Sequence, residues 1–155
     1  MKKTILVLVG LFLVSGLYGA GGLDFRLNFG AMSNFDFDDY LWSAGVELDL
    51  HLGSNMMLSP EVDLIGYKFE FKDFFLTPGV VFNFKFSKLF IGAGLIRPFL
   101  LTDASGLEEI DTWLLKLNAG FLFGNLKLTV YALTSFEDFL TSSGTLIGAK
   151  FGFGL

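Results

Sequence analysis

Side chains alternate between two kinds along the C-terminal stretch from Gly144 to Leu155. One set is apolar apart from a single threonine, and consists of Leu155, Phe153, Phe151, Ala149, Ile147 and Thr145. The intervening positions hold glycines, Leu146 and Lys150. A period of two is typical of a β-strand with two unlike faces. The apolar face of such a strand packs either on a soluble core or, in a transmembrane barrel, against lipid.

The same alternation recurs in seven earlier segments, so the chain is predicted to form eight strands. They cover residues 23–29, 42–52, 58–64, 76–86, 89–96, 113–121 and 126–133, before the final 144–155. Short turns at 53–55, 87–88 and 124–125 alternate with longer loops that include 32–40, 97–111 and 135–143. This layout predicts an all-β fold, an eight-stranded antiparallel up-and-down transmembrane β-barrel. Near Gly66 the alternation changes phase, which suggests a bulge or the exit from the bilayer.

Residues 1–20 have the features of a secretory signal peptide. Lys2 and Lys3 precede an apolar run at 5–14 and a stretch of small residues around Ala20. Cleavage is favoured over an N-terminal anchor, because the apolar run is shorter than the roughly 20 residues of a spanning helix. Residues 21–155 then form the barrel domain. The sequence contains no cysteine, so disulfides play no part in its stability.

The remaining chain is hydrophobic, with a mean hydropathy of +0.59 over the whole sequence, yet it has no second apolar run of helix-spanning length. In a bilayer such a chain must pair its backbone groups between strands, which only a closed barrel achieves. The alternative is a soluble, lipocalin-like barrel with the apolar face inside. It would crowd both tryptophans and many of the twenty phenylalanines into a narrow eight-stranded lumen. The membrane barrel is therefore favoured.

Charged residues are divided between the loops and the inward strand positions. Sixteen acidic residues outnumber eleven basic ones, which argues against nucleic-acid binding because that function needs a basic face. The inward positions carry a balanced set: Asp24, Arg26, Glu47, Asp49, Glu61, Asp63, Lys85, Lys116, Lys127 and Lys150. Buried charges must be paired, so these residues are predicted to form a salt-bridged plug in the lumen. A gated ion path is the alternative, because inward glycines such as Gly120 and Gly148 leave space for water.

Toward the longer loops the inward positions become apolar, and comprise Phe75, Ile96, Leu114, Leu133 and Leu146. These residues form either a packed cap or a mouth that holds a small hydrophobic solute. Pro60 and Pro78 occupy lipid-facing positions on neighbouring strands, where proline interrupts the hydrogen-bond ladder. They suggest a bulge or, alternatively, a lateral opening through which a solute would leave.

No catalytic or metal site and no cofactor is predicted, and the chain is not expected to be an enzyme. His51 is the only histidine, and Ser59 on the next strand can approach it with Asp49 or Glu61 as an orienting group. Both His51 and Ser59 face the lumen, away from lipid acyl chains, so a catalytic triad is disfavoured. The acidic loop at 36–39 lacks the glycine turn and terminal glutamate of a calcium loop, and is expected to be solvated.

The signal peptide, the eight alternating strands, the acidic loops and a last strand containing Phe151 and Phe153 together resemble the small bacterial outer-membrane barrels. These include the OmpA transmembrane domain and the OmpX and OmpW groups. The resemblance is architectural and covers residues 21–155, although the chain ends in Leu155 where the family usually has phenylalanine. It implies a location in the bacterial outer membrane, in contact with the lipid bilayer and lipopolysaccharide. It also implies that periplasmic chaperones and the outer-membrane assembly machinery are partners during biogenesis.

The function expected on this basis is that of a structural barrel with a largely closed lumen. One alternative is a small porin or an OmpW-like channel for small hydrophobic molecules. Another is surface adhesion or interaction through the acidic loops.

Overall fold

The computed structural model describes residues 22–67, 73–102, 106–137, 139, 141 and 144–155; the predicted signal peptide at 1–20 lies outside them. Eight long strands make up the barrel: β1 (Leu23–Asn34), β2 (Tyr40–His51), β3 (Met56–Tyr67), β4 (Phe74–Phe86), β5 (Leu89–Ile96), β8 (Leu114–Phe123), β9 (Leu126–Ser135) and β10 (Thr145–Gly154). Two short strands, β6 (Phe99–Thr102) and β7 (Gly106–Glu109), form a hairpin. Within the described residues, no helix has the length and apolar character needed to cross a membrane.

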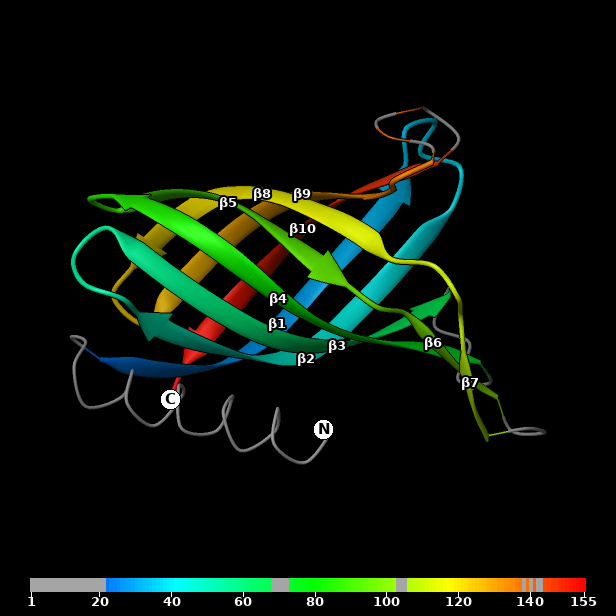
Figure 1. The fold of residues 1–155 in the computed structure, drawn as a ribbon, viewed down its shortest axis with the longest axis horizontal. Helices are drawn as coiled ribbons and strands as arrows, with labels where there is room; N and C mark the ends of the chain where they lie inside the picture. Colours follow the sequence, from blue (N-terminus) through cyan, green and yellow to red (C-terminus); the bar gives the residue numbers. More distant parts are fainter. Residues whose placement is uncertain (1–21, 68–72, 103–105, 138, 140, 142–143) are drawn as a thin grey trace, which may run out of the picture.

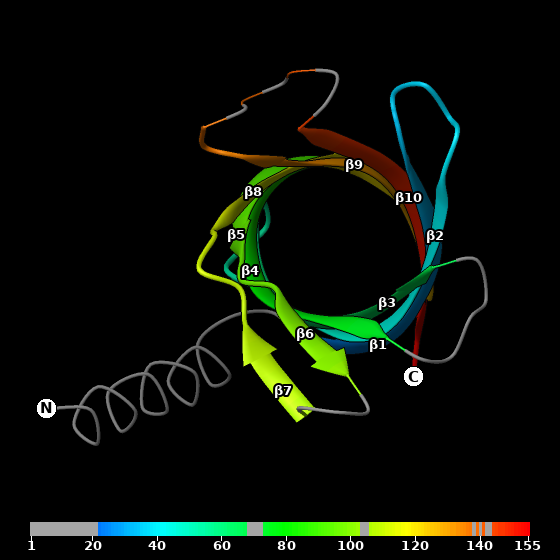
Figure 2. The ribbon, with the colours of Figure 1, turned by 90° about the vertical axis from the view of Figure 1, so that its right-hand side faces the viewer.

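The eight long strands form one closed ring. Each is hydrogen-bonded to two antiparallel neighbours, in the order β1-β2-β3-β4-β5-β8-β9-β10. The first and last strands pair with each other, with Ala31 opposite Ala149, which closes the sheet. Figure 1 shows the strands tilted across the long axis, and Figure 2 shows the ring along that axis. The predicted eight-stranded antiparallel up-and-down barrel is therefore confirmed.

The two ends of the barrel differ. One end carries the short turns, the start of β1 and the C-terminus, and is called the turn end here; the opposite end is the loop end (Figure 1). The strands continue further toward the loop end than predicted, since β1 reaches Asn34 and β4 begins at Phe74. A continuous loop over 97–111 was a wrong prediction, because this segment contains the β6–β7 hairpin. Strand β6 pairs with the beginning of β4, and the hairpin projects sideways from the ring (Figure 2).

Gly66 lies within an unbroken register on both sides. The β3–β4 ladder is continuous from Met56 to Gly66, and the β2–β3 pair keeps one register, although Leu48 and Asp49 have no ladder partners opposite Pro60 and Ser59. A bulge at Gly66 was therefore a wrong prediction. Pro60 lies opposite Val80, and Pro78 lies opposite Val62, in the continuous β3–β4 ladder. On its other side Pro60 interrupts the β2–β3 ladder, as expected for a proline, without shifting the register.

Burial follows the predicted alternation along the strands. On β1 the inward Arg26 and Asn28 are each 2% exposed, whereas the outward Leu27 and Phe29 are 36% and 47% exposed. The apolar face therefore forms the outside of the barrel and the polar face lines the inside. This arrangement is that of a membrane barrel and the reverse of a soluble one.

Candidate functional site

Asp49 on β2 is the centre of an ion-paired cluster near the turn end of the lumen. Its fully buried carboxylate accepts hydrogen bonds from Arg26 Nε at 2.7 Å, from Lys127 Nζ at 2.8 Å and from Ser59 Oγ at 2.5 Å. Lys127 also pairs with Glu47. Three donors on one carboxylate compensate for a desolvation penalty that amounts to several kcal/mol per buried ion.

Glu61 on β3 is the centre of a second cluster. Lys116 from β8 pairs with its Oε1 atom, and Lys150 from β10 donates to its Oε2 atom at 2.6 Å. Lys150 Nζ also lies 3.2 Å from Glu47 Oε2 and 3.4 Å from Asp63 Oδ2. These charged side chains are all buried. Because the lysines come from the far side of the ring, the ion pairs span the lumen and connect the two clusters.

The remaining predicted charges form a more exposed group at the turn end. Asp24 Oδ2 accepts a hydrogen bond from Arg26 Nη2 at 3.1 Å and lies 3.0 Å from His51 Nε2. Lys85 Nζ lies 2.9 Å from His51 Nδ1, so this lysine contacts an imidazole. The Asp24 side chain is 46% exposed. His51 is thus placed between Asp24 and Lys85, whereas Ser59 donates to Asp49, and the two are not arranged as a base and a nucleophile.

Neutral polar residues that the sequence analysis did not single out extend the network. Asn28 Nδ2 donates to Glu47 Oε2 at 2.8 Å, and Asn83 Nδ2 donates to Ser59 Oγ at 3.1 Å. Both amides are buried. Their inward positions follow from the same alternation that identified the charges, so the pattern contained the signal for them.

An apolar layer lies in the lumen toward the loop end. It consists of Met32, Ile65, Ile96, Tyr131 and Leu133, with Leu41, Leu114 and Leu146 packed against it. Four of the five residues predicted for the mouth are therefore brought together. The fifth, Phe75, is 36% exposed and does not belong to this layer. Ile96 is only 2% exposed, so a solute would enter only if the layer parted.

Aromatic rings occupy the space beside two inward glycines. A Cβ atom on Gly120 would lie 2.5 Å from Phe90 Cζ, and one on Gly148 would lie 2.6 Å from Tyr131 Cζ. The centroid of the Phe90 ring also lies 5.0 Å from Lys127 Nζ, and the centroid of the Tyr131 ring lies 4.8 Å from Lys116 Nζ. These distances are in the range of cation–π contacts. The glycines therefore accommodate bulky side chains that fill the lumen.

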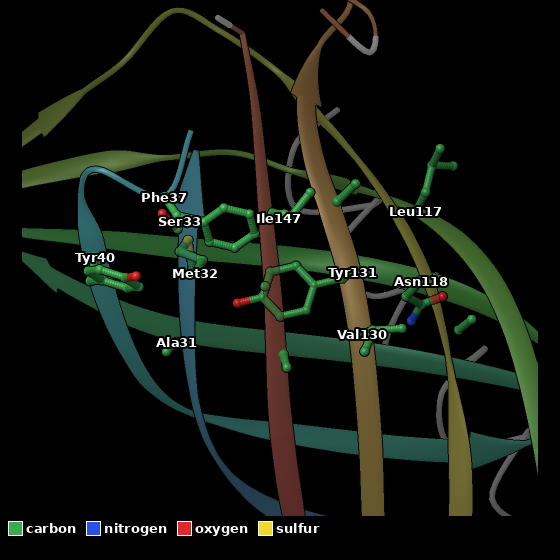
Figure 3. Close-up of a pocket in the computed structure, with 14 residues that line it drawn as sticks. Ala31, Met32, Ser33, Phe37, Tyr40, Leu117, Asn118, Val130, Tyr131 and Ile147 are labelled. Atoms are coloured by element: carbon green, nitrogen blue, oxygen red, sulfur yellow. The ribbon is translucent and has the colours of Figure 1, made fainter. Parts of the chain in front are cut away.

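Exposed aromatic residues border a groove at the loop end. Phe37, on the segment joining β1 and β2, and Tyr40, the first residue of β2, are 55% and 58% exposed. The groove has a volume of about 650 Å³, and its other walls come from β1, β8, β9 and β10. Figure 3 shows Phe37 and Tyr40 on one side of it and Leu117 on the other. Phe37 has a φ of 58°, unusual for a bulky residue, and its N–H donates to Asn34 O at 3.2 Å.

Taken in order from the turn end, the lumen contains a half-exposed polar group, two linked ion-paired clusters and an apolar layer. An ion that crossed this interior would have to displace paired charges in a low-dielectric surrounding, and then pass between packed apolar side chains. The arrangement therefore favours a closed interior.

Comparison with known proteins supports the fold. No family model matches the sequence, and no curated protein matches it. A de novo designed transmembrane β-barrel is similar in structure, with a TM-score of 0.57 and 13% identity over 85% of this chain and 95% of that one. Neisserial surface protein A has a TM-score of 0.51 and 9% identity, over 88% of this chain and 99% of that one. The N-terminal β-barrel domain of Pseudomonas aeruginosa OprF has a TM-score of 0.51 and 11% identity, over 85% of this chain and 97% of that one.

At these identities the likeness shows a shared fold, that of small transmembrane β-barrels. The finer resemblance to the OmpA, OmpX or OmpW groups stays a prediction.

Proposed function

We propose that this protein is an integral barrel of the bacterial outer membrane, with a closed lumen and a structural role. The observation that carries the proposal is the set of ion pairs across the lumen, in which Lys116, Lys127 and Lys150 meet carboxylates from the facing strands. Because a buried charge is costly unless it is paired, these ion pairs favour a packed interior over a continuous water column. The outer wall would contact lipid and, on the loop side, lipopolysaccharide.

The proposal includes a route to the membrane. Residues 1–20 would direct secretion, and periplasmic chaperones and the outer-membrane assembly machinery would then insert residues 21–155. The interior is proposed to have no enzymatic role.

Two measurements test the proposal. After carbonate or urea washing, the protein should stay in the membrane pellet; recovery in the soluble periplasmic fraction would rule out membrane integration. In planar bilayers, the refolded wild type should give no steady conductance above that of the lipid alone. A steady ohmic current from the wild type would contradict the closed lumen.

A second candidate function is surface interaction through the loops. It is favoured by the exposure of Phe37, Tyr40, Phe136 and Phe139, each more than half exposed, next to acidic residues at 36–39 and Glu137. Aromatic and acidic side chains together fit a cationic polypeptide. Barrels in nanodiscs should then bind an arginine-rich peptide, and Phe37→Ala should weaken the binding more than replacement of a lipid-facing phenylalanine at the turn end, such as Phe86→Ala.

A further inference from the structure

The outer wall has a second groove, which crosses strands β1–β5 from Phe25 to Arg97 and Trp113 at the loop end. Its volume is about 640 Å³. Most of its lining is apolar and faces outward, including Val46, Val62, Pro78, Val80 and Leu95. The four aliphatic members of this set are 38–46% exposed. An apolar groove in a wall that faces lipid offers a place for a single acyl chain.

Arg97 lies at the upper edge of this groove. It follows directly on β5, and its backbone N–H donates to Pro78 O at 2.9 Å, which fixes the chain at that point. The guanidinium carbon lies 5.1 Å from the centroid of the Trp113 ring, and both residues line the groove. Trp113 is 47% exposed, as expected for a tryptophan at the boundary between the apolar core and the headgroups of a membrane.

The hydrogen-bonding capacity of Arg97 is only partly used. Nη2 pairs with Glu109 on β7, whereas Nε is buried and has no acceptor among the described residues. The side chain is 30% exposed, so a ligand in the groove can reach the guanidinium. Of the basic residues in the described ranges, Arg97 is the one that lies on the outside at the loop end; the others line the lumen or, like Lys88, lie at a short turn.

The β6–β7 hairpin stands above the groove. Phe99 at the start of β6 lines it, and the hairpin projects sideways from the ring (Figure 2). Leu101 and Leu107 lie opposite each other in the hairpin and are 39% and 55% exposed. If the barrel spans a bilayer, this hairpin lies over the headgroup layer, with the groove beneath it.

We infer that the groove is a binding site for a membrane lipid with an anionic phosphate headgroup. One acyl chain lies along the apolar lining, and the phosphate accepts hydrogen bonds from Arg97. Guanidinium groups bind phosphate oxygens with paired, charge-assisted hydrogen bonds, and the exposed part of the Arg97 side chain is open to such a contact. The inference rests on the proposed membrane location, and it adds a specific lipid contact at one point of the wall.

The test uses the full refolded barrel in detergent micelles, with native mass spectrometry to count retained phosphatidylglycerol. The wild type should retain one molecule per barrel. Arg97→Gln should lower the apparent affinity about tenfold, the effect expected for loss of one charge-assisted hydrogen bond. Lys88→Gln, which removes an exposed charge at a turn, should leave retention unchanged. Diacylglycerol with the same chains should bind the wild type no better than phosphatidylglycerol binds Arg97→Gln.

Two further variants separate binding from stability of the hairpin. Glu109→Gln removes the competing carboxylate, so retention of the anionic lipid should rise above that of the wild type. Val80→Trp fills the groove without changing charge, and should abolish retention in a barrel that keeps its β-sheet circular dichroism.

Equal retention by the wild type and Arg97→Gln would overturn the inference, as would loss of retention in Glu109→Gln. Neither result would contradict the proposed structural role. That role would be contradicted by release of the protein from the membrane on washing.

Discussion

Lys116→Met tests whether the lumenal charges form a structural network. The substitution keeps most of the side-chain stem and removes the ammonium group that pairs with Glu61 Oε1. Removing one partner of a buried ion pair costs about 3–5 kcal/mol. Lys150 still donates to Glu61 Oε2 at 2.6 Å, so a loss near the lower limit, about 3 kcal/mol, is expected. With a slope of about 2 kcal/mol/M, this loss lowers the urea midpoint by roughly 1.5 M.

The assay is equilibrium urea unfolding in lipid vesicles, followed by tryptophan emission. Adding Glu61→Gln to Lys116→Met removes the excess negative charge of the Glu61 carboxylate. The free energy of unfolding of the double variant should therefore lie within about 1 kcal/mol of the wild-type value. Lys88→Met, at an exposed turn position, is the matched control and should change stability by less than about 0.5 kcal/mol. A small loss for Lys116→Met together with a large gain in conductance would refute the plug and indicate a gate.

Other consequences of the interior can be tested in the same unfolding assay. Asp49→Asn should cost about 3–5 kcal/mol, because it leaves the charges of Arg26 and Lys127 under-compensated. Gly66→Ala should cost about 1–3 kcal/mol and shift the tryptophan emission, because its Cβ would lie 2.5 Å from the indole Cε2 of Trp42. Raising NaCl from 0.1 to 1 M should change the wild-type midpoint little, since buried pairs are poorly screened; a large shift would show that water reaches them.

Alternation was sufficient to predict the ring of eight strands and the inward face of each. A period of two assigns every residue of a strand to one face, and a sheet with a lipid-facing apolar side has to close. The pattern could not identify partners across the lumen. Lys116 contacts Glu61, whereas Lys85 contacts His51. These pairings depend on the stagger between strands, and the local periodicity of the sequence carries no information about stagger.

The errors arose near the rim, where burial no longer constrains the pattern. The four-residue strands β6 and β7 are too short to show a period, and β6 contains three apolar residues in succession, Phe99, Leu100 and Leu101. Phe75 has the parity of an inward residue but lies near the start of β4, where it is 36% exposed. Gly66 suggested a bulge because it changes the phase of the sequence, whereas its lack of a side chain accommodates the indole of Trp42 in an unbroken register.

Two chemically different sections occupy the lumen, and their difference bears on whether the barrel could conduct ions. A salt-bridged section can open by exchange of partners, since two of the lysines already contact more than one carboxylate: Lys127 pairs with two and Lys150 approaches three. The apolar layer has no such low-energy exchange, because parting Ile96 from Tyr131 and Leu133 would expose close-packed apolar surface to water. Charge switching alone would therefore rearrange the lower lumen without making a path. An ion channel in this barrel would need movement of the strands themselves at the loop end, against the closed ladder of the ring.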